Sequence, residues 1–194
     1  RIAVGVSGGK DSLILLTALA RLREFYPVPF TVEAITLDMG AAEGRPGMDF
    51  SPIADFCRTL GVPYTILSSE IQHIIFDVRR EKNPCSMCAK MRRGALHGAM
   101  QERGLTKIAL GHHYDDAIET FFMSLIFEGR LSCFQPVTYL DRTGITQIRP
   151  LLYCGETLIR HTAQRLALPV VENPCPADGN TKRQEIKELI YELQ

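Results

Sequence analysis

The chain has 194 residues, and its 22 lysine and arginine residues balance its 22 aspartate and glutamate residues. Hydrophobic residues make up 45% of the chain and charged residues 23%, which is typical of globular proteins and excludes a disordered, collagen-like or coiled-coil chain. No apolar run approaches the roughly 18 residues that a membrane-spanning helix needs. The balanced charge argues against a uniformly basic protein that coats nucleic acid. The length predicts a single domain over residues 1–194.

Five short apolar runs predict β-strands, at residues 2–6, 30–37, 63–67, 107–110 and 147–151. Apolar residues at helical spacing predict helices at residues 13–23, 51–60, 88–103, 117–127, 156–166 and 182–192. Residues 152–194 are either part of the same domain or a C-terminal helical extension that carries Cys175. Because the chain begins at Arg1, just before the first strand, we expect the native N-terminus to be missing.

This alternation of strands and helices predicts an α/β fold, with an open, mostly parallel five-stranded sheet and helices on both faces. Ligands bind such sheets at the carboxyl ends of the strands. Three segments rich in polar residues or glycine directly follow predicted strands: residues 7–12, the residues from Asp38 onward, and residues 111–116. We therefore expect the functional site at this edge of the sheet.

The loop Ser7-Gly8-Gly9-Lys10-Asp11-Ser12 joins the first predicted strand to the first helix. Two glycines let a backbone turn tightly and bring its N–H groups close to an anion, and the helix adds the positive end of its dipole. A plain turn would use the glycines but needs neither the serines nor the lysine. The loop is not the mononucleotide P-loop, because the spacing differs and a carboxylate follows the lysine. The dinucleotide pattern Gly-x-Gly-x-x-Gly is absent as well.

A strand followed by Ser-Gly-Gly-x-Asp-Ser and a helix resembles the PP-loop ATPases, also called N-type ATP pyrophosphatases. The resemblance implies an adenine nucleotide α-hydrolase-like fold and cleavage of ATP between the α and β phosphates. Such enzymes adenylate a carbonyl or carboxylate oxygen and release pyrophosphate. The residues that this resemblance assigns to ATP binding are Ser7, Gly8, Gly9, Lys10, Asp11 and Ser12.

Two of the six cysteines, Cys85 and Cys88, have the spacing of metal ligands. Alone, such a pair fits a redox dithiol, half of a zinc site or a cluster. The tripeptide Asn-Pro-Cys at residues 83–85 recurs at residues 173–175, and three converging thiolates would suit a cubane iron–sulfur cluster with one iron left open. The alternative is that Cys175 is an ordinary loop thiol. Cysteine usage of this kind is typical of a reducing cytoplasm rather than of a secreted disulfide scaffold.

Pro-Cys-x-x-Cys-x-x-x-Arg-Arg-Gly, then Gly-His-His-x-Asp-Asp and a late Pro-Cys, resembles the tRNA 2-thiocytidine synthetase family. The resemblance implies an enzyme that adenylates O2 of a cytidine in the tRNA anticodon loop and replaces it with sulfur. It also implies a 4Fe–4S cluster held by Cys85, Cys88 and Cys175. Two positions depart from the family pattern: Asp178 stands where a further cysteine is common, and Tyr114 stands where arginine is usual.

Residues 111–116 begin with Gly111 and His112 and end with two adjacent carboxylates, Asp115 and Asp116. Adjacent carboxylates need a cation or a helix N-terminus nearby. We expect one of them to cap the following helix and the other to bind magnesium on ATP. Asp38 would contact adenosine, act in the chemistry or simply cap its strand. The predicted catalytic residues are Lys10, Asp38 and Asp115, and the predicted nucleotide site adds Gly111, His112 and Asp116.

Basic residues surround the cysteine pair: six lysines and arginines and one glutamate between residues 79 and 93 give a local charge of 6 − 1 = +5. The expected partner is tRNA, and the alternative is an ordinary solvated face. The sulfur would come from a cysteine desulfurase or free sulfide, carried on the cluster or as a cysteine persulfide. A homodimer is a further expectation. Alternative functions are a 2-thiouridine or lysidine type of tRNA-modifying enzyme, or a non-catalytic nucleotide-binding redox sensor.

Overall fold

The computed structural model describes residues 1–41, 47–81, 84–171, 175 and 181–193. Its sheet has six strands in the order β3-β2-β1-β4-β6-β5, and each neighbouring pair is parallel except β5 with β6. The prediction of a mostly parallel α/β sheet is confirmed, but the number of strands is six rather than five. The strands are β1 Ile2–Gly5, β2 Val32–Asp38, β3 Tyr64–Ser68, β4 Lys107–Ala109, β5 Val137–Leu140 and β6 Ile145–Ile148.

The additional strand, β5, pairs with β6 in a hairpin closed by Gly144, whose φ is +67°. It is an edge strand of only four residues, Val137–Leu140, and its side chains alternate between exposed and half-buried. The last predicted strand, 147–151, is displaced to 145–148. Pro150 lacks the N–H group that a further ladder bond would require.

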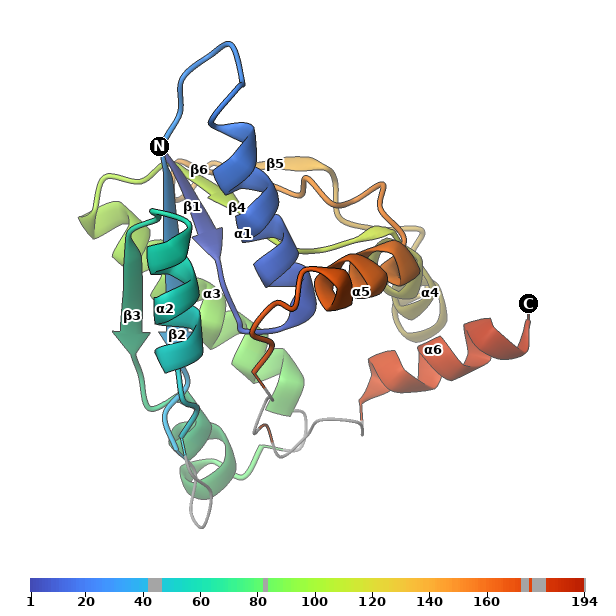
Figure 1. The fold of residues 1–194 in the computed structure, drawn as a ribbon. Helices are drawn as coiled ribbons and strands as arrows, with labels where there is room; N and C mark the ends of the chain where they lie inside the picture. Colours follow the sequence, from blue (N-terminus) through green and yellow to red (C-terminus); the bar gives the residue numbers. More distant parts are fainter. Residues whose placement is uncertain (42–46, 82–83, 172–174, 176–180, 194) are drawn as a thin grey trace.

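The helices lie close to their predicted positions, and a π-helical segment is added before the third. They are α1 Lys10–Leu22, α2 Ser51–Thr59, η1 His73–Val78, α3 Pro84–Glu102, α4 Tyr114–Glu128, α5 Glu156–Arg165 and α6 Lys182–Glu192. The main core packs α1, α2 and α5 on one face of the sheet, and a smaller core packs α3 on the other (Figure 1). Helix α6 packs on α4. Within the described residues, no helix is both long and apolar enough to cross a lipid bilayer.

The order of the strands determines where the site lies. The chain adds β2 and β3 on one side of β1 and then returns to place β4 on the other side. The loops that follow β1 and β4 therefore leave neighbouring strands at a topological switch point, where open α/β sheets bind ligands. These loops are residues 6–9 and 110–113, which contain the motifs found in the sequence.

An ion pair between Arg103 and the buried carboxylate of Glu33 connects the C-terminal end of α3 to β2. Glu33 is only 8% exposed, and its Oε1 accepts hydrogen bonds from Nη2 and Nε of Arg103 at 2.6 and 2.9 Å. Arg1 Nη2 lies 3.1 Å from Oε2 of the same carboxylate. Since α3 carries Cys85 and Cys88 near its other end, this pair helps to hold the cysteine-bearing helix on the sheet.

Replacing Arg103 with methionine should lower the free energy of unfolding by about 1–3 kcal/mol, because a largely buried carboxylate loses its main partner. Glu33→Gln should cost less, because it leaves no buried charge behind. Urea unfolding of both variants measures the difference. A larger loss for Glu33→Gln than for Arg103→Met would contradict this interpretation.

Candidate functional site

The loop between β1 and α1 is held in shape by its own two serines. Ser12 Oγ donates to the Gly9 carbonyl at 2.9 Å and accepts from the Ser7 N–H at 3.2 Å, and the two serine hydroxyls lie 3.3 Å apart. Gly9 is the N-cap of α1. The predicted phosphate-binding loop therefore leads directly into a helix N-terminus, and the serines fix the course of its backbone.

Two glycines allow close approaches that a side chain would block. Gly8 has φ +86°, and a Cβ there would lie 2.5 Å from Met48 Cε. A Cβ on Gly111 would lie 3.1 Å from the backbone of both Asp11 and Ser12. The loop after β4 therefore rests against the first residues of α1, which brings the two sequence motifs into one site.

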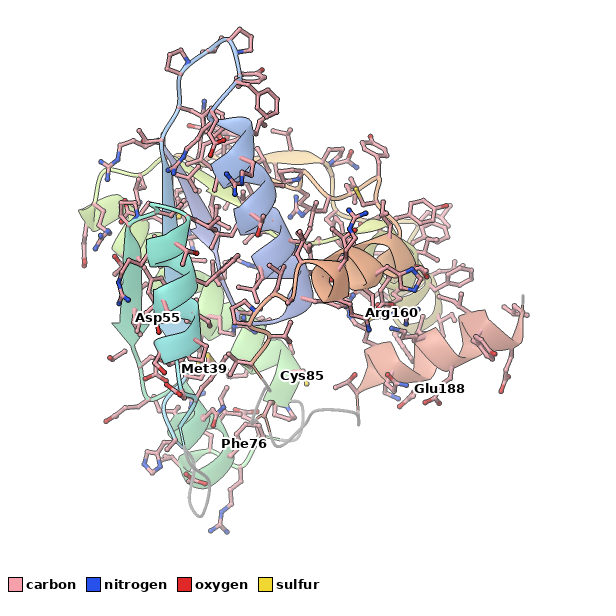
Figure 2. The ribbon with its side chains drawn as sticks, viewed as in Figure 1. Met39, Asp55, Phe76, Cys85, Arg160 and Glu188 are labelled. Carbon is pink, nitrogen blue, oxygen red and sulfur yellow. The ribbon has the colours of Figure 1, made fainter. Side chains whose placement is uncertain are left out.

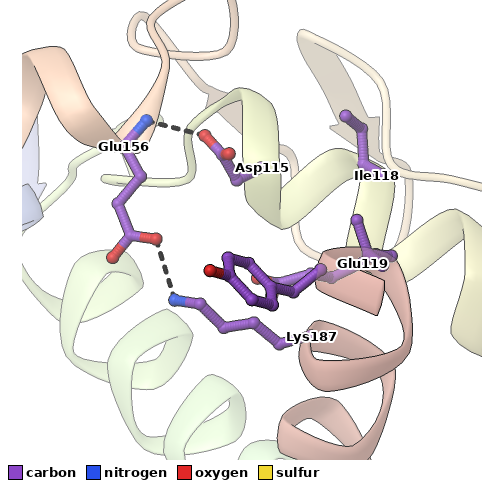
Figure 3. A pocket seen from close by; sticks show the side chains of 7 residues that line it. Asp115, Ile118, Glu119, Glu156 and Lys187 are labelled. Atoms are coloured by element: carbon purple, nitrogen blue, oxygen red, sulfur yellow. Dashed lines mark hydrogen bonds and ion pairs between the residues drawn. The ribbon is translucent and has the colours of Figure 1, made fainter. Parts of the chain in front are cut away.

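Lys10 lies between two carboxylates. Its Nζ is 3.1 Å from Asp11 Oδ1 and 3.1 Å from Glu156 Oε1. Burial alone would lower the pKa of Lys10, but the two carboxylates outweigh burial and raise it. Glu156 also binds Lys187 of α6 at 2.8 Å (Figure 3). The hydrogen bond from Lys187, together with Lys10, lowers the pKa of Glu156 to about 2.

The adjacent carboxylates Asp115 and Asp116 stabilise two different helices. Asp115 Oδ2 accepts the N–H of Glu156 at 2.6 Å and so caps α5 (Figure 3). Asp116 closes a capping box with His113, the N-cap of α4, and its other oxygen binds Arg183 at 2.9 Å. Of the two, Asp115 has the more exposed side chain, at 42% against 21%. It is therefore the better placed of the pair for a metal on bound nucleotide.

The two remaining predicted nucleotide residues, His112 and Asp38, make local contacts within the fold. His112 packs its ring against Phe134 at 4.9 Å between centroids, and burial lowers its pKa. Asp38 accepts the N–H of Gly40 at 2.9 Å at the end of β2, which matches the strand-capping alternative. It directly precedes Met39, which lines the cysteine cavity described next.

Two of the three predicted ligands, Cys88 and Cys175, line one cavity of about 50 Å³. Helix α3 begins at Pro84, four residues before the predicted start, so Cys85 and Cys88 both lie in its N-terminal part. Cys85 is exposed there. Met39, Phe76 and Cys85 lie at the same end of the molecule (Figure 2). The other residues that line the cavity are Gln72, Ile75, Phe76, Arg92 and Met39.

The pKa of Cys88 is set by its burial and by charged groups around it, which include the other two predicted ligands. Burial raises the pKa of Cys88, the charge of Arg92 opposes this, and interactions with Cys175 and Cys85 raise it further. Three neighbouring thiolates therefore need compensating positive charge, which bound metal supplies. Among the described residues, no three His, Cys, Asp or Glu side chains lie close enough to hold a single metal ion. A cubane cluster would not need three side chains around one ion, because each thiolate would bind a different iron atom.

Sequence reasoning misses the residues that connect α6 to the site. A cavity of about 160 Å³ lies between α4, α5 and α6, and its lining includes Asp115, Glu156 and Lys187 (Figure 3). An acidic residue in the first turn of a helix is common, so Glu156 carries no distinctive signal.

Of the predicted basic residues, Lys90, Arg92 and Arg93 are exposed on α3, and Lys82 lies outside the described residues.

Replacing Glu156 with glutamine should strengthen binding of inorganic pyrophosphate by about threefold to tenfold, because the attraction of one nearby carboxylate for Lys10 is worth on the order of 1 kcal/mol. Isothermal titration calorimetry measures the affinity. Glu188→Gln is the matched control, since Glu188 is exposed on α6 and hydrogen bonds only locally to Gln184 among the contacts described. Unchanged or weaker binding of pyrophosphate by the Glu156 variant would show that Glu156 does not compete with the phosphates for Lys10.

Comparisons with known proteins agree with this geometry. The PP-loop domain family matches residues 1–193. A tRNA-cytidine(32) 2-sulfurtransferase from Alkalilimnicola ehrlichii is 40% identical over 99% of this chain and 60% of its own length. The protein of the same name from Pelobacter propionicus is 40% identical over the whole chain and 72% of its own length. The chain thus spans about 60–72% of these two relatives.

Among solved structures, the U34-tRNA thiolase NcsA from Methanococcus maripaludis, determined with its [4Fe–4S] cluster, superimposes with a TM-score of 0.79. It is 25% identical in sequence, and the match covers 99% of this chain and 65% of that one. These matches cover nearly the whole of this chain and agree with the phosphate loop at the switch point. The chain belongs to the PP-loop family and, within it, to the tRNA-cytidine(32) 2-sulfurtransferases.

Proposed function

We propose that the chain is the catalytic PP-loop domain of an ATP-dependent tRNA sulfurtransferase that replaces O2 of an anticodon-loop cytidine with sulfur. The observation that carries the proposal is that the Ser-Gly-Gly loop at the start of α1 and a cavity lined by Cys88 and Cys175 occur in one domain, with Cys85 one turn away from Cys88 on α3. A lysidine-type enzyme would have no use for the thiol site. The names of the relatives favour cytidine over uridine as the target.

In the first half of the reaction, the cytidine O2 attacks the α-phosphorus of ATP, and the bond to pyrophosphate breaks. The N-terminus of α1 and Lys10 offset the negative charge that develops on the phosphates. Lys10 must leave Glu156 to do so, and Lys187 then remains as the partner of that carboxylate. Asp115 is the proposed ligand of magnesium on ATP, and Asp38 is the proposed contact to adenosine.

In the second half, a sulfur nucleophile adds to C2 of the adenylated cytidine, and AMP leaves with the former O2. A 4Fe–4S cluster bound by Cys85, Cys88 and Cys175 would supply an open iron that holds this sulfur without exposing a free thiol to oxidation. Arg92 hydrogen bonds to Cys88, and both side chains line the cavity. The charge of Arg92 partly opposes the rise in the pKa of Cys88 that burial causes.

The remaining features of the proposal follow from charge and redox chemistry. The exposed cations Lys90 and Arg93 lie on the cysteine-bearing helix, where they would steer tRNA phosphates to the thiol site. A cysteine desulfurase or free sulfide would provide the sulfur. A reducing compartment such as the cytoplasm suits three exposed or half-buried thiols. A homodimer is the assembly we expect.

Serine at position 85, 88 or 175 should abolish binding of the cluster and thiolation of tRNA while the fold is retained, because each thiol ligates a separate iron. The measurement is iron, acid-labile sulfide and absorbance near 400 nm after anaerobic purification, beside tRNA thiolation. Cys133→Ser is the matched control, since that thiol donates to the Ala117 carbonyl within the fold. Full iron content in any one of the three variants would overturn the ligand set, and zinc in the wild type would overturn the cluster.

Lys10→Met should weaken ATP binding by about tenfold or more, because one close charge–charge contact with the phosphates is worth at least about 1.4 kcal/mol. Equilibrium dialysis with radiolabelled ATP measures the affinity. Lys107→Met serves as control, because Lys107 is exposed at the amino end of β4, at the opposite edge of the sheet. Equal affinity of the Lys10 variant and the wild type would remove Lys10 from the nucleotide site.

A further inference from the structure

The cavity between α4, α5 and α6 adjoins the phosphate loop. Its volume is about 160 Å³, and all three helices contribute residues to it (Figure 3). Pockets for drug-sized ligands measure roughly 300–1,000 Å³, so this cavity suits a single small ring. One of its lining residues, Glu156, also places Oε1 3.1 Å from Lys10 Nζ. A ring bound in the cavity would therefore lie beside the phosphates on which Lys10 acts.

Two isoleucines and a tyrosine give the cavity walls that suit a flat ring. Ile118 of α4 and Ile190 of α6 are half-buried and line it. Tyr191 lines it as well, although 79% of its surface is exposed. Proteins that read single-stranded RNA stack unpaired bases on exposed aromatic rings of this kind. The tyrosine therefore gains little packing from the fold and is available to a nucleobase.

The buried carboxylate of Glu119 supplies a hydrogen-bond acceptor to the cavity. Glu119 is only 6% exposed, and its Oε2 accepts from Arg183 Nη1 at 3.0 Å. Its other oxygen, Oε1, has no hydrogen-bond partner within the described part of the chain. Burial raises the pKa of Glu119, and the charges of Arg183 and Lys187 oppose that rise. An unpaired acceptor on a buried carboxylate is costly, which favours a ligand that donates a hydrogen bond to it.

Lys187 supplies a donor to the same cavity. Its ammonium group has three N–H bonds, and among the described residues it donates only to Glu156 Oε2, at 2.8 Å. The cavity thus offers an acceptor from α4 and a donor from α6. The Watson–Crick edge of cytosine carries the complementary groups, an N4 amine that donates and an N3 that accepts. Uracil carries an O4 acceptor and an N3–H donor instead, so both of its groups would meet a group of the same kind.

We propose that this cavity binds the base of the target cytidine: Glu119 accepts the N4 amine, Lys187 donates to N3, and Tyr191 stacks on the ring. This inference deepens the proposed function and rests on it. N4, N3 and O2 follow one another along the edge of the base. A base held in this way turns O2 toward the contacts that lead from Lys187 through Glu156 to Lys10. The cytidine must be unstacked to enter, which a single-stranded anticodon loop permits.

The experiment measures the affinity of anaerobically purified protein for anticodon stem-loop RNAs by fluorescence anisotropy. The RNAs carry cytidine, uridine or 2-pyrimidinone at the target position, and 2-pyrimidinone keeps O2 and N3 but lacks the N4 amine. The variants are Glu119→Met and Tyr191→Leu, with Glu128→Met and Tyr139→Leu as matched controls. Glu128 is exposed on α4 and Tyr139 is 60% exposed on β5, and neither lines the cavity. Circular dichroism reports whether each variant is folded.

The wild type should bind the cytidine loop about tenfold more tightly than the 2-pyrimidinone loop, because a hydrogen bond to a charged acceptor is lost. The uridine loop should bind more weakly still. Glu119→Met should bind the cytidine and 2-pyrimidinone loops equally, since no acceptor remains for the N4 amine. Tyr191→Leu should weaken binding of both loops by about tenfold and keep the preference, as expected for a lost stacking contact. Both controls should match the wild type.

Two results would overturn the inference: a wild type that binds the cytidine loop no more tightly than the other two, or a folded Glu119→Met protein that keeps the wild-type preference. Wild-type affinities in Tyr191→Leu would remove the stacking contact. The proposed function is tested separately, by whether the wild type forms 2-thiocytidine in the cytidine loop with ATP and sulfide. Absence of that product would contradict the function, whereas loss of base preference alone contradicts only the cavity assignment.

Discussion

The site depends on one close contact between two backbone segments, where Gly111 rests against the first residues of α1. The contact exists because β1 and β4 are neighbours in the sheet although about a hundred residues separate them in the chain. A side chain at Gly111 would push the phosphate loop away from the N-terminus of α4. Both helix N-termini therefore face the same region, and this region is suited to a polyanion.

Ion pairs and hydrogen bonds connect this contact to the helices around it. Lys10 binds Glu156, Glu156 binds Lys187, and Asp115 caps the helix that Glu156 begins. A second branch runs from the α4 N-terminus through Asp116 to Arg183. Both branches end on α6, the helix that follows Cys175. Both branches thus hold α6 to the nucleotide half of the site.

Sequence reasoning finds the parts of this structure that have local signals. Apolar runs bounded by glycine or proline locate β1 to β4, and the Gly-Gly loop with its serines locates the start of α1. It misses β5, a four-residue edge strand that pairs only with β6. It correctly expects a cap among Asp115 and Asp116 but does not show that Asp115 caps α5, because that contact joins residues 41 positions apart. The contact of Arg183 with Asp116 is likewise long-range, because it joins residues 67 positions apart.

The most direct test of the account is a nucleoside analysis of unmodified tRNA incubated anaerobically with the reconstituted protein, ATP and sulfide. Mass spectrometry of the digested tRNA and quantification of AMP are made on the same samples. The account predicts that 2-thiocytidine forms with one AMP and one pyrophosphate for each sulfur atom transferred. Release of AMP without a thiolated nucleoside, or sulfur found only in uridine, would contradict it.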